Sequence, residues 1–223
     1  MPSPLDPRSA YELLAPTYEE ENVVTALDRE AIDRLSADDR GGFLLDLGCG
    51  TGRRLDGLSV PALGVDLVPE MLAQGRRSGR QRLAAGRAER LPLRSGLFST
   101  IWCRLVIGHL ASLHAIYTEI ARVGAPSAQV LITDFHPHAI RAGWSRTFRC
   151  PGRASVEIEH HVHTARDHEG IALQAGLAIE ATIDLPVGRS VRSYYERAGK
   201  SELYESQLGM PLLLAIRMRR IAE

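Results

Sequence analysis

The sequence predicts an α/β fold in which helices cover both faces of a mostly parallel sheet, and three observations carry this prediction. Between residues 43 and 135, short apolar runs alternate with amphipathic segments whose apolar residues recur at helical spacing. The alternating units are short, which is typical of parallel sheets. The chain has 223 residues, 44% of them apolar and 24% charged, which suits one globular domain with a sizeable core.

Two helices are expected before the first strand. The segment 7–21 places apolar residues three and four positions apart, namely Tyr11, Leu14, Ala15 and Tyr18. The second helix, 22–35, begins at Asn22, a residue type that caps helices. Gly41 and Gly42 then interrupt the chain before the first strand.

From residue 43 onward, strands and helices alternate. The expected strands are 43–47, 62–66, 82–86, 98–106 and 128–135, and the helices between them are 53–58, 68–78 and 109–123. Ligands of such sheets bind beyond the carboxyl ends of the strands, near the point where the strand order reverses. The glycine-rich loop after Leu47 lies at that edge.

After Phe135 the pattern changes. Residues 136–163 are irregular and rich in His and Arg, and a strand-like run occupies 156–164. A helix is expected over 165–176 and a strand over 177–185. An insertion over 188–206 precedes a long closing strand at 210–220, which brings the expected sheet to seven strands.

Charge and cysteine content limit the partners and the compartment. Lys and Arg together number 27, as do Asp and Glu, so the formal net charge is zero. This balance gives no long-range attraction for nucleic acid or an anionic membrane. No apolar stretch approaches a membrane span, and the first residues do not resemble a signal peptide. The wide spacing of Cys49, Cys103 and Cys150 predicts neither a disulfide framework nor a Cys-x-x-Cys metal site. We therefore expect a cytoplasmic protein without nucleic-acid or membrane partners.

The loop LLDLGCGTG, residues 44–52, is the first candidate binding feature. A dinucleotide-binding fingerprint requires a third glycine where this chain has Arg53, and a P-loop requires a Gly-Lys-Ser/Thr sequence that does not follow. Asp66 ends the second strand about 20 residues after Asp46, where an acid can accept hydrogen bonds from both ribose hydroxyls. A nucleoside cofactor site is therefore favoured over a purely structural turn.

Four segments together resemble the class I S-adenosylmethionine-dependent methyltransferases: LLDLGCGTG, GVDLVPEML, GRAERLP and FSTIWCRLVIGHL. Within this family, the chain resembles the small-molecule branch that modifies quinones and polyketides. Its segment AYELLAPTYEE is also similar to the N-terminal segment of that branch. The resemblance implies a Rossmann-like sheet with the last strand antiparallel, S-adenosyl-L-methionine as cofactor and S-adenosyl-L-homocysteine as product. It also implies one domain over 1–223, with a helical lid (1–40), a cofactor-binding core (41–135) and substrate-side insertions (136–163 and 188–206).

The resemblance assigns cofactor contacts residue by residue. The loop glycines, with Cys49 between them, would let the backbone approach the methionine part of the cofactor: Gly48, Gly50 and Gly52. Asp46 would bind its amino group, Asp66 the ribose, and Leu67 the adenine. The adenine would also contact the segment of Arg87, Ala88 and Glu89, the far side of the cofactor would meet Cys103 and Arg104, and Tyr18 would cover it.

Two positions depart from the family pattern. Many relatives carry Asp where this chain has Arg87, so the resemblance implies either a weaker affinity for the cofactor or an adenine contact supplied by Glu89 instead. Relatives often carry Asp where this chain has Ser99, at the start of the fourth strand. These departures leave open a protein that binds the cofactor without catalysis, as a partner subunit. A nicotinamide dehydrogenase is a weaker alternative, opposed by Arg53.

His109, after the fourth strand, is the candidate general base, because methylation of oxygen or carbon usually needs one and His suits neutral pH. It can equally be a helix-start residue with a structural ring. His136 and His138 leave the fifth strand at the same edge, and Tyr194 and Tyr195 are further candidates for contact with substrate.

The run 156–164 also invites a zinc interpretation, because His161 and His163 would share a strand face with two glutamates. A strand edge of the lid is the favoured alternative, and no metal is expected.

The expected activity is methylation of a small molecule at oxygen or carbon. No Asn/Asp-Pro-Pro-Tyr/Phe loop follows the fourth strand, so methylation of base amino groups is disfavoured, and a tRNA or protein acceptor is a minor alternative. We expect a monomer or a homodimer.

Overall fold

A computed structural model describes residues 3–36, 41–148 and 155–221. Its centre is a seven-stranded sheet of order β3-β2-β1-β4-β5-β9-β8. The strands are β1 (Leu44–Leu47), β2 (Ala62–Asp66), β3 (Leu83–Ala85), β4 (Phe98–Arg104), β5 (Gly124–Phe135), β8 (Leu177–Pro186) and β9 (Pro211–Arg220). The last strand, β9, runs antiparallel to both of its neighbours, β5 and β8, whereas β1 to β5 pair in parallel. The predicted fold class is therefore confirmed.

Alternate residues of the central strands face opposite sides of the sheet and form two separate cores. On one side, Leu45 and Ile101 pack with helices α4 (His114–Val123) and α6 (Ala165–Gln174). On the other side, Leu44 and Trp102 pack with α2 (Val23–Leu35) and α7 (Arg192–Arg197). Burial on both faces explains why these strands read as continuous apolar runs.

The strand order reverses at β1, which lies between β2 and β4. The register pairs Leu47 with both Val65 and Cys103, so these three strands end at a common edge. The glycine-rich loop leaves β1 at this point, where ligands of open α/β sheets bind.

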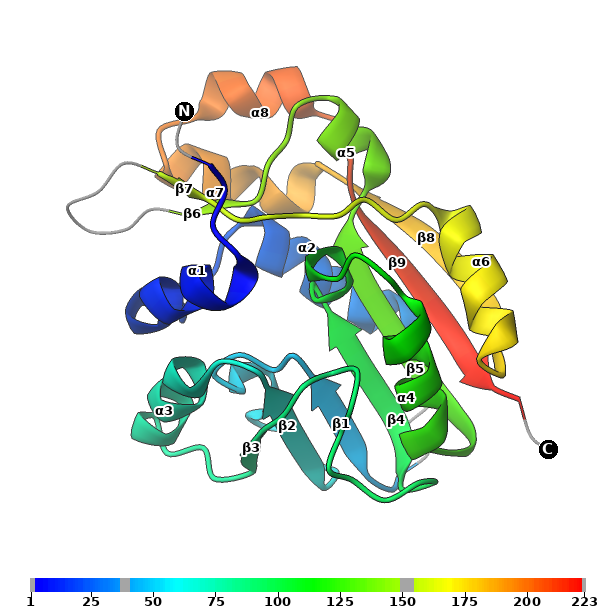
Figure 1. Cartoon of the computed structure of the whole chain (residues 1–223). Helices are drawn as coiled ribbons and strands as arrows, with labels where there is room; N and C mark the ends of the chain where they lie inside the picture. Colours follow the sequence, from blue (N-terminus) through cyan, green and yellow to red (C-terminus); the bar gives the residue numbers. More distant parts are fainter. Residues whose placement is uncertain (1–2, 37–40, 149–154, 222–223) are drawn as a thin grey trace.

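Several short helices lie beyond this edge of the sheet, as Figure 1 shows. They are α1 (Pro7–Leu14) with the 3-10 turn η1 (Ala15–Thr17), α5 (Pro137–Arg141), α7 and α8 (Ser201–Gln207). Asp6 caps α1 by accepting a hydrogen bond from the Ser9 N–H, and Asn22 caps α2 in a capping box with Thr25. The remaining helix, α3 (Pro69–Arg77), follows β2.

The N-terminal segment is joined to the segment that follows residue 154. The Leu5 N–H donates to the Glu157 carbonyl at 2.9 Å, and the Leu5 carbonyl accepts from the Glu159 N–H at 2.8 Å. A short hairpin of β6 (Thr147–Phe148) and β7 (Val156–Glu157) adjoins this contact. The two parts of the chain over the sheet edge are thus connected through backbone hydrogen bonds.

Two local predictions were wrong. The helix expected over 53–58 is only a 3-10 turn, η2 (Arg53–Leu55), because Gly52 and Gly57 on either side adopt left-handed backbone angles, with φ of 74° and 76°. The strand expected over 156–164 is limited to β7. The Ile158 N–H still donates to the Arg146 carbonyl beside β6, but beyond it the partner changes: the Glu159 N–H donates to Leu5 and the His161 N–H to Gly108.

Other boundaries shift modestly. The first helix breaks at Ala15, the helix expected from residue 109 begins at His114, and the insertion 188–206 contains α7 and α8. Pro137 at the first position of α5 starts a helix in a segment expected to be irregular. Cys150 and the rest of 149–154 lie outside the described residues, as do 37–40 of the expected lid. No helix in the described part of the chain is long and apolar enough to cross a membrane.

Candidate active site

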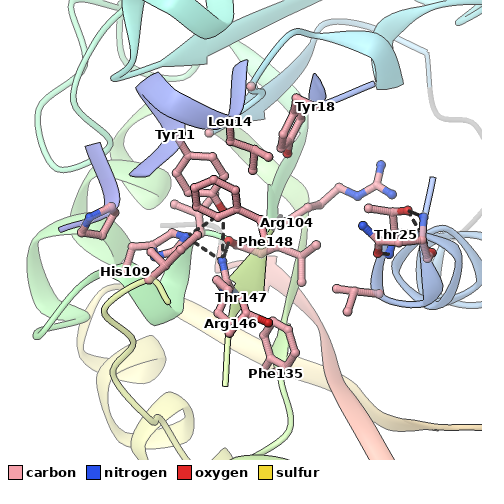
Figure 2. A pocket seen from close by; sticks show the side chains of 18 of the residues that line it. Tyr11, Leu14, Tyr18, Thr25, Arg104, His109, Phe135, Arg146, Thr147 and Phe148 are labelled. Carbon is pink, nitrogen blue, oxygen red and sulfur yellow. Dashed lines mark hydrogen bonds between the residues drawn. The ribbon is translucent and has the colours of Figure 1, made fainter. Parts of the chain in front are cut away.

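A cavity of about 1050 Å³ lies between the carboxyl edge of the sheet and the helices above it. Its walls come from α1, η1, the ends of β1, β2 and β4, the segment 144–148 and α7. Figure 2 shows side chains from α1, the end of β4 and the segment 144–148 converging on it. Such a volume is at or above the upper end of the usual range for one small ligand, about 300–1,000 Å³.

Asp66, at the end of β2, is fixed against the glycine loop. Its Oδ2 accepts a hydrogen bond from the Gly50 N–H at 2.7 Å and its Oδ1 accepts from the Val68 N–H at 2.8 Å. Burial raises the pKa of Asp66, and the backbone hydrogen bonds from Val68 and Gly50 oppose that change. Each carboxylate oxygen keeps a second lone pair, so the group can accept two further hydrogen bonds from a ligand in the cavity.

The three loop glycines have different neighbours. A Cβ on Gly50 would lie 2.9 Å from Cε1 of Tyr18, whose ring comes from the end of η1. A Cβ on Gly48 would lie 2.1 Å from Cγ2 of Val106, and one on Gly52 would lie 2.5 Å from Cδ2 of Leu83. Gly48 and Gly50 line the cavity, whereas Gly52 and Cys49 do not, so Gly52 is required for packing against β3.

Asp46 lies at the end of β1 with 2% of its surface exposed. Its Oδ2 atom is buried and has no hydrogen-bond partner among the described residues. Burial raises the pKa of Asp46 to about 6, although Arg104 and Arg54 lower it in part. Asp46 does not itself line the cavity, but Gly48, two residues further on, does.

Arg104, at the end of β4, is held by a buried carboxylate on α2. Its guanidinium donates to Asp28 through Nε (3.3 Å) and a terminal nitrogen (2.8 Å). Arg54 forms an ion pair with the same carboxylate, and the Thr133 hydroxyl donates to it. Burial alone would raise the pKa of Asp28, but the two arginines and Thr133 hold it below its ordinary value. We refer to Asp28, Arg54, Arg104 and Thr133 as the Asp28 cluster.

Leu67 and the segment after β3 form another part of the cavity wall. Arg87, Ala88 and Glu89 all contribute to the wall there. Arg87 is 65% exposed and forms an ion pair with Glu89 at 3.1 Å. The positive charge of Arg87 is thus directed toward solvent and Glu89, and the Glu89 carboxylate remains at the wall.

His109, which follows β4, contacts two polar side chains: Tyr11 from α1 and Arg146 from the segment 144–148, as Figure 2 shows. Its Nε2 atom lies 2.6 Å from a terminal guanidinium nitrogen of Arg146 and 3.1 Å from the Tyr11 hydroxyl oxygen. Arg146 is also held by the Leu105 carbonyl at 2.7 Å and by Asp134 at 2.8 Å. Burial, followed by the charge of Arg146, lowers the pKa of His109 well below its ordinary value.

The remaining candidate residues divide between the cavity and positions outside it. Tyr194 and Tyr195 line the cavity, where their hydroxyls donate to Glu21 at 3.1 Å and to Gln207 at 2.8 Å. His136 and His138 do not line it: the His136 ring accepts from the His138 N–H at the start of α5. Cys103 is fully buried outside the cavity, and burial raises the pKa of its thiol.

The histidines of the run 156–164 do not form a metal site. His163 contacts the Leu110 carbonyl at 2.8 Å, and His160 packs edge-on against Phe135. The part of the chain that the structure describes contains no group of three or more His, Cys, Asp or Glu side chains that could hold a metal ion.

Residues 45–132 match a family model described as a methyltransferase domain. They form a class I, S-adenosylmethionine-dependent methyltransferase domain. The cofactor of this methyltransferase is S-adenosylmethionine.

The methyltransferase is similar to a malonyl-[acyl-carrier protein] O-methyltransferase from Dechloromonas aromatica (strain RCB). The two are 28% identical over 209 residues, which cover 86% of this chain and 72% of that protein.

Two solved structures share the fold. One is a complex of the Trm112 methyltransferase activator with a methyltransferase from Haloferax volcanii, at 16% identity and a TM-score of 0.72, covering 99% of each chain. The other is geranyl diphosphate C-methyltransferase from Streptomyces coelicolor A3(2) with S-adenosyl-L-homocysteine, at 17% identity and a TM-score of 0.64. It covers 88% of this chain and 79% of that one.

The sequence did not point to three residues of the site: Tyr11 and Arg146, which line the cavity, and Asp28, which holds the lining residue Arg104. Asp28 lies between the core residues Leu27 and Ala31 of α2, and an acid at a core position is a signal for a buried ion pair. Tyr11 was considered only for its apolar spacing. Arg146 lies in an irregular segment, where no periodicity indicates direction.

Proposed function

We propose that the enzyme transfers the methyl group of S-adenosylmethionine to a carboxylate oxygen of a small, partly apolar acid. The observation that carries this proposal is the contact between His109 and Arg146. A guanidinium can only donate hydrogen bonds, so the Nε2 lone pair of His109 is engaged by Arg146 and is not free to accept a proton.

An alcohol or a phenol usually needs a general base when it is methylated. A carboxylic acid, with an ordinary pKa of about 4, is already ionised at neutral pH and needs none. His109 in its present contacts thus suits an anionic acceptor, and the low pKa of the ring also disfavours proton uptake. Similarity to an O-methyltransferase named for malonyl-[acyl-carrier protein] supports methylation at oxygen.

Features of the cavity fit the cofactor. The Asp66 carboxylate has lone pairs for the ribose hydroxyls. The unpaired Oδ2 of Asp46 is buried and does not line the cavity, so it would reach the cofactor's amino group through water. The bare backbone of Gly48 and Gly50 leaves room for the methionine part, which Tyr18 would cover. Leu67, Ala88 and Glu89 would meet the adenine, with Glu89 taking the place of the acid that Arg87 replaces. When bound, S-adenosylmethionine supplies an electrophilic methyl group on a positively charged sulfur.

The acceptor would occupy the part of the cavity under the segment 144–148. Trp144, Phe148, Phe135, Leu14 and Leu110 give this part an apolar wall. Tyr11, His109 and Arg146 supply its polar end. An acid with an apolar body and one carboxylate matches this distribution. The chain's contribution is mainly to orient the two reactants, because alignment alone can lower the barrier by several kcal/mol.

The test has two stages. Calorimetry with S-adenosylhomocysteine and with NAD on one preparation should show binding of the first and not the second; preference for NAD would contradict the cofactor site. Methyl transfer from labelled S-adenosylmethionine is then measured with carboxylic acids, quinols and phenols. We expect base-labile methyl esters from the acids. Methyl ethers formed from quinols or phenols alone would refute carboxylate methylation and restore His109 as the candidate base. Binding without any transfer across the panel would support a cofactor-binding partner instead.

A further inference from the structure

The polar end of the acceptor region holds more hydrogen-bond donors than the His109 ring can accept. Nε2 has a single lone pair, and both the Arg146 guanidinium and the Tyr11 hydroxyl lie within hydrogen-bond distance of it. Arg146 is the closer group, at 2.6 Å against 3.1 Å, and it carries a charge that strengthens the bond. A proton on Nε2 would point at a cation 2.6 Å away, so we assign the ring proton to Nδ1, a buried atom that has no hydrogen-bond partner among the described residues.

The proton of the Tyr11 hydroxyl is therefore left without an acceptor in this cluster. The Arg146 nitrogen that lies 3.4 Å from the Tyr11 oxygen is the one that also contacts the Leu105 carbonyl at 2.7 Å and His109 at 2.6 Å. Its two N–H groups are therefore engaged by these closer acceptors, and Tyr11 is not held by Arg146. No described residue accepts a hydrogen bond from the Tyr11 hydroxyl apart from the contested Nε2 atom.

Tyr11 also occupies the junction between the cofactor and acceptor parts of the cavity. Its ring lies edge-on to the Tyr18 ring, with centroids 6.1 Å apart, and Tyr18 covers Gly50. On its other side, the Tyr11 ring lies edge-on to His109, with centroids 5.3 Å apart. Figure 2 shows the Tyr11 side chain with Tyr18 and His109 on either side.

We propose that Tyr11 is the acceptor-binding residue of this methyltransferase and that its hydroxyl donates a hydrogen bond to the acceptor carboxylate. This inference rests on the proposed carboxylate methylation. The hydrogen bond holds one carboxylate oxygen toward α1 and involves no proton transfer, so Tyr11 remains a neutral phenol. Arg146 fills the Nε2 lone pair of His109, so that the Tyr11 hydroxyl beside it stays available to the acceptor.

Two variants on the same helix provide the test. Tyr11→Phe removes only the hydroxyl. Glu12→Gln is the matched control, because Glu12 is part-exposed on the same helix and does not line the cavity, although its partner Arg8 does. Nitrogen NMR of ¹⁵N-histidine-labelled protein, with His109 assigned from a His109→Gln sample, should show a protonated Nδ1 and an unprotonated Nε2. The Nε2 signal in Tyr11→Phe should fall within the range set by wild type and control.

Binding of benzoate to the S-adenosylhomocysteine complex tests the acceptor contact directly. We expect Tyr11→Phe to raise the dissociation constant of benzoate about 10-fold, as for loss of one hydrogen bond to a charged group. It should change S-adenosylhomocysteine affinity less than about twofold, whereas a purely structural role in closing α1 over the cavity would weaken both. Glu12→Gln should change neither.

Three results would overturn the inference: a Tyr11-dependent shift of Nε2, equal benzoate binding by wild type and Tyr11→Phe, or no benzoate binding by the wild-type complex. The proposed function is judged separately by ester formation. Ester formation that is insensitive to Tyr11→Phe would retain the function and reject the role of Tyr11. Tyr11-dependent benzoate binding without methyl transfer to any acid would reject carboxylate methylation and retain Tyr11 as a carboxylate-binding residue.

Discussion

Replacement of Asp28 by Asn should destabilise the fold severely while preserving the size of the side chain. Asp28 is fully buried, and its carboxylate pairs with both Arg104 and Arg54, whose side chains are only 6% and 17% exposed. An Asn retains one acceptor oxygen but places an N–H₂ group where the second carboxylate oxygen meets the guanidinium groups. Removing one partner of a buried ion pair costs about 3–5 kcal/mol. That is a large share of the roughly 5–15 kcal/mol that stabilises a typical domain.

Urea unfolding monitored by circular dichroism would measure this loss as a lower midpoint. Asp33→Asn is the control, because Asp33 lies on the same helix, is exposed and does not belong to the Asp28 cluster. We expect the control to change the free energy of unfolding by less than about 0.5 kcal/mol, as for an ordinary surface substitution. A loss below about 1 kcal/mol in Asp28→Asn would refute the reasoning, because the cluster would then tolerate an uncompensated buried charge.

The same variant predicts a pH dependence with a defined sign. The pKa of Asp28 is lower in the folded protein than in the unfolded chain. Its contribution is therefore complete above the unfolded pKa of about 3.9 and is lost as the pH falls through the lower folded value. The difference in stability between wild type and Asp28→Asn should be largest near neutral pH and shrink below about pH 4. A difference that grows on acidification would contradict the assignment.

Three further predictions concern the cofactor end of the cavity. Asp66→Ala should weaken S-adenosylhomocysteine binding by about 1–3 kcal/mol in calorimetry, because the ribose hydroxyls lose a charged acceptor; unchanged affinity would show that Asp66 is misassigned. Gly50→Ala should weaken binding at least about 10-fold, since its Cβ would lie 2.9 Å from the Tyr18 ring. Gly57→Ala shares a positive φ but has no atoms within 4 Å of its Cβ, so it should lose stability without losing affinity. Glu19→Gln should speed cofactor release in stopped-flow measurements, because Glu19 pairs with Arg80 at 2.7 Å and so holds the Tyr18 segment over the loop. The Glu19 carboxylate is part-exposed, so the release rate should rise only about two- to threefold.

The sheet could be predicted from the sequence because its strands are buried on both faces and its motifs have characteristic spacing. Local elements failed where tertiary contacts outweighed pattern. The alternation of 156–164 is that of a strand, yet its N–H groups donate in turn to the Arg146, Leu5 and Gly108 carbonyls. The turn after Gly52 was expected to be a longer helix, but glycines on both sides of η2 limit it.

The candidate site shows a similar division. Asp66 and Gly50 come from segments whose spacing carries the information. Tyr11, His109 and Arg146 meet from positions separated by 98 and 37 residues, and no local pattern records that contact. His109 was a candidate general base because of its position after the fourth strand, with a structural ring as the alternative. The charge that lowers the pKa of His109 and engages its Nε2 atom comes from Arg146, which lies in an irregular segment that no periodicity places.

The backbone pairing of Leu5 with Glu157 and Glu159 has a kinetic consequence. Because α1 follows directly after Leu5 and β7 ends at Glu157, these two hydrogen bonds connect the cover over the methionine end to the wall that carries Phe148. We expect a bound methyl donor to hold both in place and therefore expect compulsory-order kinetics, in which the donor binds before the acceptor and the demethylated donor leaves last.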